Sequence, residues 1–142
     1  MSIESNARLV ERFFEEMINR ENAAIIPELM HPDVIIHDPF MGTLCGIEAF
    51  HQLIGIFNSA FPSHRVKVEQ TIAQGDLVAA LHTHYATHTG PFMGMAPTHR
   101  EIVVTGLELF RIEDDQVVEF WRKDDDAGML MQLGALPAPS SA

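Results

Sequence analysis

The chain has 142 residues, a length that fits one domain able to bury a core without disulfide staples. Hydrophobic residues make up 46% of it, which excludes a disordered chain. The formal net charge is −11, so we expect neither nucleic acid nor an anionic membrane as a partner. A small apolar or aromatic molecule remains as the kind of ligand that this composition allows.

Cys45 is the only cysteine, so no intrachain disulfide can form, as is usual in a reducing compartment. The N-terminal segment MSIESNARLVERFF is charged where a signal peptide would be apolar. No run approaches the ~20 apolar residues of a membrane span. The sequence therefore predicts a soluble, cytoplasmic protein.

Helical spacing of apolar residues dominates the first part of the chain. Ser5 or Asn6 is the expected cap of the first helix, because short polar side chains accept the free N–H groups there. The elements expected in this part are helices over 5–20, 22–30 and 46–60, and a strand followed by a loop over 31–40.

After Pro62 the period of the apolar residues changes to two, which is typical of strands. The expected strands cover 64–74, 77–88, 100–112 and 116–125, and a short helix covers 126–133. Helices followed by long strands predict an α+β fold, with a curved, mainly antiparallel sheet that packs around the N-terminal helices and encloses an apolar cavity. We expect one domain over 1–136 and a flexible tail over 137–142.

A candidate acid/base group stands where the last strand meets the last helix, in EFWRKDDDAGMLMQLG. If the strand is regular, Trp121, Lys123 and Asp125 share one face, with Trp121 as a cavity wall. Arg122 and Asp124 then face away. A carboxylate beside an apolar wall has a raised proton affinity, which suits acid/base catalysis near neutral pH. The alternative is a solvated acidic turn in which Asp125 caps the helix that follows.

Three histidines, His82, His84 and His88, share parity on one expected strand. Alternate strand residues project together, so this spacing is one possible metal arrangement, with a carboxylate from Asp125 or Asp38. We favour the alternative without a metal, in which His88 donates a hydrogen bond to a substrate carbonyl. The other two then pack or lie at the surface, with His84 as a further candidate substrate contact.

Aromatic and methionine residues in the loops predict an apolar mouth suited to a flat ligand, because methionine adapts its shape. The residues expected there are Phe40, Phe92, Met93 and Met95. His37 either orients the substrate or caps the loop that follows it. His31, His51 and His64 are expected at the surface. No Gly-rich phosphate loop occurs, so we expect no nucleotide cofactor.

These segments resemble the SnoaL-like polyketide cyclases, also called ester cyclases, a family of the nuclear-transport-factor-like superfamily of cone-shaped α+β folds. The likeness runs through most of the chain, from ELMHPDVIIHDP and CGIEAF through AFP and AQGDLVAA. It is densest in THTGPFMGMAPT and in EFWRKDDDAGMLMQLG, which are specific when they occur together in this order.

The resemblance implies a site and a reaction. An Asp four residues after the Trp is the acid/base in family members of known chemistry, and that position here is Asp125. The family pattern also maps its site histidines onto His88 and His37. The implied reaction is an intramolecular aldol condensation that closes a ring of an aromatic polyketide ester, without a cofactor or a metal. The chain departs from the family pattern at Ala86 and His99, where glycine is usual. On the penultimate strand, where a histidine is common in the family, the chain has Arg111 as the candidate substrate contact instead.

Other functions on the same scaffold stay open at this point. They are an isomerase, an epoxide hydrolase, an enzyme that assists oxygenation, or a non-catalytic dimer that binds a small molecule. Apolar residues on both parities of the long strands predict that both faces of the sheet are buried. Since helices cover only one face, we expect a homodimer through the other.

Overall fold

The computed structural model describes residues 2–139. Its first helix, α1 (Ile3–Arg12), continues directly into a π-helical stretch, η1 (Phe13–Asn19). The predicted cap was wrong, because the helix begins at Ile3. There Ser2 and Ser5 cap reciprocally, each side-chain hydroxyl accepting the backbone N–H of the other at 3.0 Å.

The next elements are η2 (Ala23–Ile25), α2 (Ile26–Leu29), β1 (Met30–Asp38), β2 (Gly42–Cys45) and α3 (Ile47–Ala60). The predicted helices and the strand of this part are confirmed in type and position. β2 was not predicted, because its four residues are too few to show a period of two. It pairs antiparallel with β1 and extends the sheet by one strand.

The remaining elements are β3 (Arg65–Gln74), β4 (Leu77–Thr87), β5 (Glu101–Glu113), β6 (Gln116–Asp124) and α4 (Asp126–Leu133). Within the described residues, six strands form one open sheet in the order β2-β1-β6-β5-β4-β3. Only β1 and β6 run parallel within it, and every other neighbouring pair is antiparallel. The predicted α+β fold with a mainly antiparallel sheet is confirmed.

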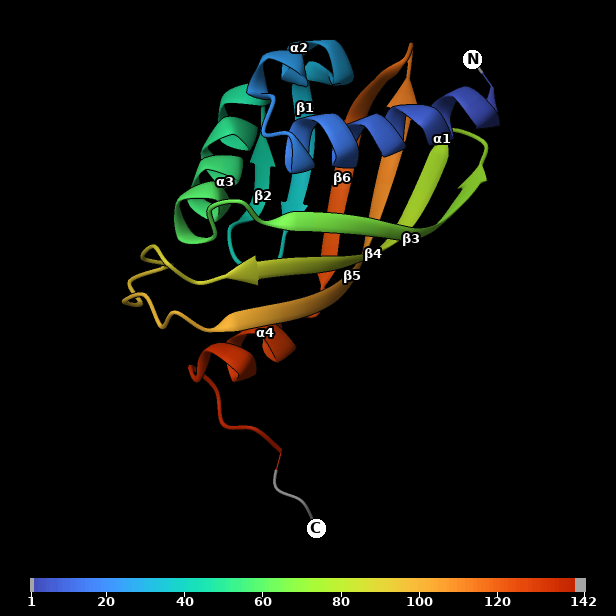
Figure 1. Ribbon diagram of the computed structural model, residues 1–142. Helices are drawn as coiled ribbons and strands as arrows, with labels where there is room; N and C mark the ends of the chain where they lie inside the picture. Colours follow the sequence, from blue (N-terminus) through green and yellow to red (C-terminus); the bar gives the residue numbers. More distant parts are fainter. Residues whose placement is uncertain (1, 140–142) are drawn as a thin grey trace.

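The helices α1 and α3, with η1, lie over one face of the curved sheet (Figure 1). Successive side chains of β5 point alternately to that face and to the outer one, so Phe110 and Ile112 are buried while Val103 and Leu107 are exposed. The main core includes Val10, Phe13, Phe14, Met17, Ile26, Leu29, Ile36, Phe50, Phe110, Val117 and Phe120. No helix within residues 2–139 is long and apolar enough to cross a membrane.

A second apolar cluster joins α4 to the end of α3 and to β5. It consists of Ala60, Phe61, Phe92, Ile102, Val104, Met129 and Leu133. β6 stops at Asp124, which leaves the start of β5 without a strand partner on that side. There the amide of Gln132 takes the place of a strand, since it accepts from the N–H of Val103 at 2.8 Å and donates to its C=O at 2.9 Å.

The outer face of the sheet carries exposed apolar side chains. Leu81 pairs with Leu107 across β4 and β5, and Tyr85 pairs with Val103. These four residues have exposed fractions between 44% and 51%. The apolar residues predicted on the second face are thus present and exposed in the single chain. Of the predicted tail, residues 137–139 form neither helix nor strand, and 140–142 lie outside the described residues.

Candidate active site

A row of three residues crosses the concave face of the sheet. His82 on β4 pairs with Gly106 on β5, and Gly106 pairs with Asp124 on β6. A Cβ at Gly106 would lie 2.0 Å from Oδ1 of Asp124, so only glycine fits between the two side chains. Across that gap Nε2 of His82 lies 3.0 Å from Oδ1 of Asp124.

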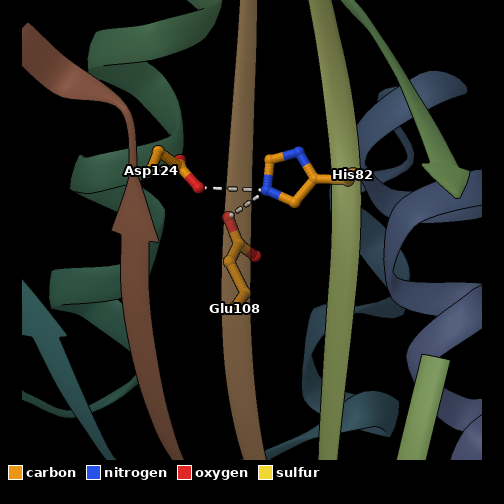
Figure 2. A group of neighbouring side chains, drawn as sticks. All are labelled: His82, Glu108 and Asp124. Carbon is orange, nitrogen blue, oxygen red and sulfur yellow. Dashed lines mark hydrogen bonds and ion pairs between the residues drawn. The ribbon is translucent and has the colours of Figure 1, made fainter. Parts of the chain in front are cut away.

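Glu108 completes the cluster from two residues further along β5. Its Oε1 lies 3.3 Å from the same Nε2 of His82, so both carboxylates converge on one ring nitrogen (Figure 2). The three side chains are 2%, 8% and 10% exposed for His82, Glu108 and Asp124. Within residues 2–139, Oε2 of Glu108 and Nδ1 of His82 are buried without a hydrogen-bond partner. The cluster therefore keeps one free acceptor and one free ring nitrogen in the interior.

Arg122 lies beside this cluster and is held by three carboxylates. Its Nε donates to Asp38 at 2.6 Å, Nη1 donates to Asp124 at 3.1 Å, and both terminal nitrogens donate to Asp126 at 2.8 and 3.0 Å. Its Cζ also lies 5.4 Å from the ring centroid of Phe40 and 5.4 Å from that of Phe57. The guanidinium is thus a fixed positive charge at the end of the cluster.

Burial and charge together shift the proton affinities of the cluster. Burial lowers the pKa of His82, but the hydrogen bonds and charges of Asp124 and Glu108 outweigh it and raise that pKa to about 10. Burial and the charge of Asp124 raise the pKa of Glu108 to about 7. Burial opposes ionisation of Asp124, yet His82 and Arg122 hold the pKa of that carboxyl below its ordinary value. Near neutral pH, Asp124 is ionised, His82 is protonated and Glu108 is poised to gain or lose a proton.

The cluster faces an interior cavity of about 70 Å³ beneath α3 and η1. Its walls are Phe13, Phe14, Ile18, Phe50, Leu53, Ile54, Phe57, His64, Val66, His82, His84, Glu108, Phe120, Arg122 and Asp124. Ligand pockets usually measure about 300–1,000 Å³, so a ring-sized ligand requires rim side chains to move. Phe57 is placed for this, since it also borders the two smaller hollows beside α4 and Phe92. A larger open groove of about 780 Å³ lies between α1 and β3 and contains none of the cluster.

The cluster also offers a donor set for a divalent cation, because its three ligand atoms lie within 4.8 Å of one another. Coordination requires a bare nitrogen, whereas Nε2 of His82 carries a proton that both carboxylates stabilise. The histidine spacing considered from the sequence does not form a metal site. His84 contacts His64 and His88 contacts Thr98, so the three imidazoles do not converge.

The structure places Asp125 outside the cavity. β6 ends at Asp124, and Asp125 is the exposed N-cap of α4, where its Oδ1 accepts the N–H of Gly128 at 2.9 Å. The strand parity was predicted correctly, but the inward face was assigned wrongly. The face of Arg122 and Asp124 is the one that carries Phe120, and therefore it turns toward the core.

Trp121, His37 and Arg111 lie together on the outer face of the sheet instead of in the cavity. The rings of His37 and Trp121 stack with centroids 5.1 Å apart, and Cζ of Arg111 lies 5.8 Å from the Trp121 ring. Glu119 joins them, with its oxygens 2.7 Å from Nε2 of His37 and 3.4 Å from Nε of Arg111. Trp121 is therefore not a wall of the described cavity.

His88 is fully buried and holds the loop between β4 and β5. Its Nδ1 accepts the backbone N–H of Thr98 at 3.1 Å. The ring packs against Phe61 with centroids 5.5 Å apart. Its Nε2 has no hydrogen-bond partner among the described residues, and His88 lines none of the cavities described above.

The predicted mouth residues are only partly brought together. Phe40 and Phe92 meet edge to face at 6.1 Å and, with Met93, border the hollow next to Asp38. Met93 is exposed, and Met95 packs on the second apolar cluster. Of all the predicted site residues, only His84 lines the main cavity.

Sequence reasoning considered His82 only as part of a metal arrangement, and it missed Glu108, Arg122 and Asp124 as site residues. Glu108, Arg122 and Asp124 share parity with Phe110 and Phe120, and a charged residue on an apolar strand face is an informative signal. Gly106 inside a strand was a second signal, since it marks the close approach of another group. His64 was expected at the surface but is buried at 3% exposure.

An open α+β sheet thus carries its helices over one face and holds a buried cluster of ionisable side chains between its strands and these helices. The sequence profile of the SnoaL-like polyketide cyclase family matches residues 8–133. The chain therefore belongs to the SnoaL-like polyketide cyclase family.

Solved structures agree with this membership. A candidate SnoaL-like polyketide cyclase from Jannaschia sp. CCS1 is 25% identical with a TM-score of 0.88, over 96% of this chain and 97% of that one. AclR, a candidate hydroxylase from Streptomyces galilaeus, is 27% identical with a TM-score of 0.86, over 99% and 87%. IdmH, a candidate polyketide cyclase from Streptomyces antibioticus, is 28% identical with a TM-score of 0.78, over 91% and 98%. No curated protein matches the chain in sequence.

Proposed function

We propose that the protein is an acid/base enzyme that closes a ring in a polyketide-like small molecule by an intramolecular aldol reaction, without a cofactor or a metal. Family membership supports a cyclase-type function. The observation that carries the proposal is Glu108, a buried carboxyl with one free oxygen at the cavity wall, next to two fixed positive charges. Because burial raises the pKa of this carboxyl to about 7, it is suited to proton transfer near neutral pH.

Glu108, as carboxylate, takes a proton from an activated methylene of the substrate. The enolate carbon then forms a bond to a carbonyl carbon of the same molecule, and the carbonyl π pair becomes an alkoxide. Protonated Glu108 returns its proton to that oxygen, so the product is an isomer of the substrate. The charges of His82 and Arg122 stabilise the enolate and the alkoxide, and such preorganised groups typically supply about 3–4 kcal/mol each.

The other members of the cluster act through Glu108 and His82. Asp124 stays ionised and keeps the proton on Nε2 of His82, which in turn holds Oε1 of Glu108. Asp38 and Asp126 fix Arg122. In this proposal Glu108 takes the role that the sequence suggested for Asp125, since Asp125 caps α4.

A pH–rate profile tests this assignment. The probe is an aromatic β-keto ester with a ketone within ring-closing reach, and the product is quantified by chromatography and mass spectrometry. We expect kcat/KM to rise with a midpoint near pH 7 as Glu108 ionises, and to fall near pH 10 as His82 loses its proton. A rate that stays constant from about pH 5 to 9 would contradict the proposal, since no group of the cluster would then control it.

We also propose that two chains associate through the outer face of the sheet, around Leu81, Tyr85, Val103 and Leu107. Isolated exposed apolar residues are ordinary, but four that are paired across neighbouring strands form a patch. A two-fold axis allows this patch to cover itself. A cytoplasmic location remains a prediction from the sequence.

A further inference from the structure

A chain of hydrogen bonds runs from α3 to the cavity wall through two histidines. Oδ1 of Asn58 lies 2.6 Å from Nε2 of His64. Nδ1 of His64 in turn lies 2.6 Å from Nε2 of His84, which stands on β4. Neither Asn58 nor His64 has a part in the proton transfer described above.

Neither histidine of this chain carries a charge near neutral pH. Burial lowers the pKa of His64. Burial, followed by the neighbouring imidazoles of His64 and His82, lowers the pKa of His84 to about 3, and Asp124 opposes this shift while Arg122 adds to it. A hydrogen bond between two neutral imidazoles requires one ring to donate and the other to accept.

The amide of Asn58 decides the direction. Its oxygen only accepts, so Nε2 of His64 must carry the proton and Nδ1 of His64 must be bare. The bare Nδ1 then accepts from Nε2–H of His84. A neutral ring has one N–H, so when Nε2 of His84 donates to His64, Nδ1 of His84 carries a lone pair.

The position of His84 makes this lone pair a candidate hydrogen-bond acceptor for a ligand. The ring lines the main cavity together with His82 and Glu108, and it also borders the smaller hollow beneath α4. The polar wall of the cavity therefore combines two kinds of group. His82 and Arg122 carry positive charge, and His84 is a neutral acceptor.

We propose that Asn58 and His64 are positioning residues that hold His84 as a neutral acceptor at Nδ1, and that this acceptor selects substrates with a hydroxyl or enol proton next to the ring-closing carbons. The inference rests on the proposed function only in taking the cavity as the substrate site. It adds that the preferred substrate is a hydroxylated aromatic or an enolised ketone, because a methylated oxygen cannot donate to Nδ1.

The tautomers of His64 and His84 in the free protein test directly whether His84 is held as a neutral acceptor at Nδ1. Protein with ¹⁵N-labelled histidine is studied at pH 7 by long-range ¹⁵N–¹H correlation, which distinguishes a protonated ring nitrogen from a bare one. We expect His64 and His84 both to carry the proton on Nε2. A proton on Nδ1 of His84, which would follow from the reverse orientation of the Asn58 amide, would overturn the inference.

A matched pair of variants shows whether Asn58 sets the direction. Asn58→Leu removes the acceptor, and we expect His64 and His84 to become mixtures of both tautomers. Gln52→Leu, at an exposed position of the same helix, should leave both rings as in the parent. Unchanged tautomers in Asn58→Leu would assign the direction to another group and contradict the role of Asn58.

Ligand binding tests whether this acceptor selects molecules that carry a hydroxyl or enol proton. The probes are 2-naphthol and 2-methoxynaphthalene, which share a ring system and differ in the hydroxyl proton. We expect the parent to bind 2-naphthol about fivefold more tightly, the effect of one neutral hydrogen bond, and His84→Phe to lose that preference. Equal or weaker binding of the naphthol by the parent would refute the selectivity. These readouts need no turnover, so their failure is distinguishable from a failure of the acid/base proposal.

Discussion

Nε2 of His82 and Oδ1 of Asp124 lie 3.0 Å apart although a whole strand separates β4 from β6. The contact exists because the residue between them, Gly106, has no side chain. Glu108 reaches the same nitrogen from the strand in between. One missing Cβ thus allows a buried histidine to be shared by two carboxylates, and this sharing sets the proton affinities of the site.

Gly106→Ala should break this contact. The added methyl group would overlap Oδ1 of Asp124, so that side chain must leave the row. We expect a loss of about 1–3 kcal/mol in the free energy of unfolding, measured by urea titration. Thr105→Ala, an exposed neighbour on the same strand, serves as the control. If both variants unfold at the same urea concentration, the glycine has no such role.

The stability of the protein should decrease as the pH rises from 6.5 toward 10. The pKa of His82 is raised from 6.5 to about 10 in the folded state, which means that folding favours its protonated ring. That contribution is complete below pH 6.5 and is lost as the pH passes through about 10. We expect the parent to lose on the order of a few kcal/mol over this range by urea unfolding at each pH.

The variant His82→Gln should lack most of this decrease, whereas His51→Gln, at a partly exposed position of α3, should keep it. A parallel pH dependence in His82→Gln and the parent would mean that the ring carries no proton in the folded protein at neutral pH.

The outer face of the sheet should mediate dimerisation. Sedimentation equilibrium at micromolar concentration is expected to give twice the 15.9 kDa of one chain, with roughly 800 Å² buried on each. Leu107→Glu places a charge in the centre of the patch and should yield monomers, while Gln52→Glu on α3 should not. A parent that sediments as a stable monomer of 15.9 kDa would refute the dimer.

Local periodicity was enough to predict most of the fold. The apolar alternation of β5 and the helical spacing of α3 depend on neighbouring residues only, so the sequence contains them in full. β2 was not predicted because its four residues are too few to form a pattern. The reciprocal cap at Ser2 was not predicted because the apolar spacing of α1 begins later than the helix itself.

The site was harder to predict because it depends on which face of the sheet the helices cover. Both faces carry apolar residues, such as Phe110 inside and Leu107 outside, so the pattern does not distinguish them. The choice between Asp124 and Asp125 follows from that face and from the end of β6. The pairing of His64 with His84 joins the turn after α3 to β4, a contact that no local pattern contains.

The central claim is that the interior carboxylate Glu108, and not Asp125, transfers the proton. The most direct measurement compares Glu108→Gln and Asp125→Asn for ring closure of the aromatic β-keto ester at pH 8. Glutamine keeps the size of the side chain but removes the base, so we expect a loss of about a hundredfold or more in kcat/KM. Asparagine also caps helices well, so Asp125→Asn should remain within about threefold of the parent. A large loss in Asp125→Asn together with a nearly unchanged Glu108→Gln would contradict the account.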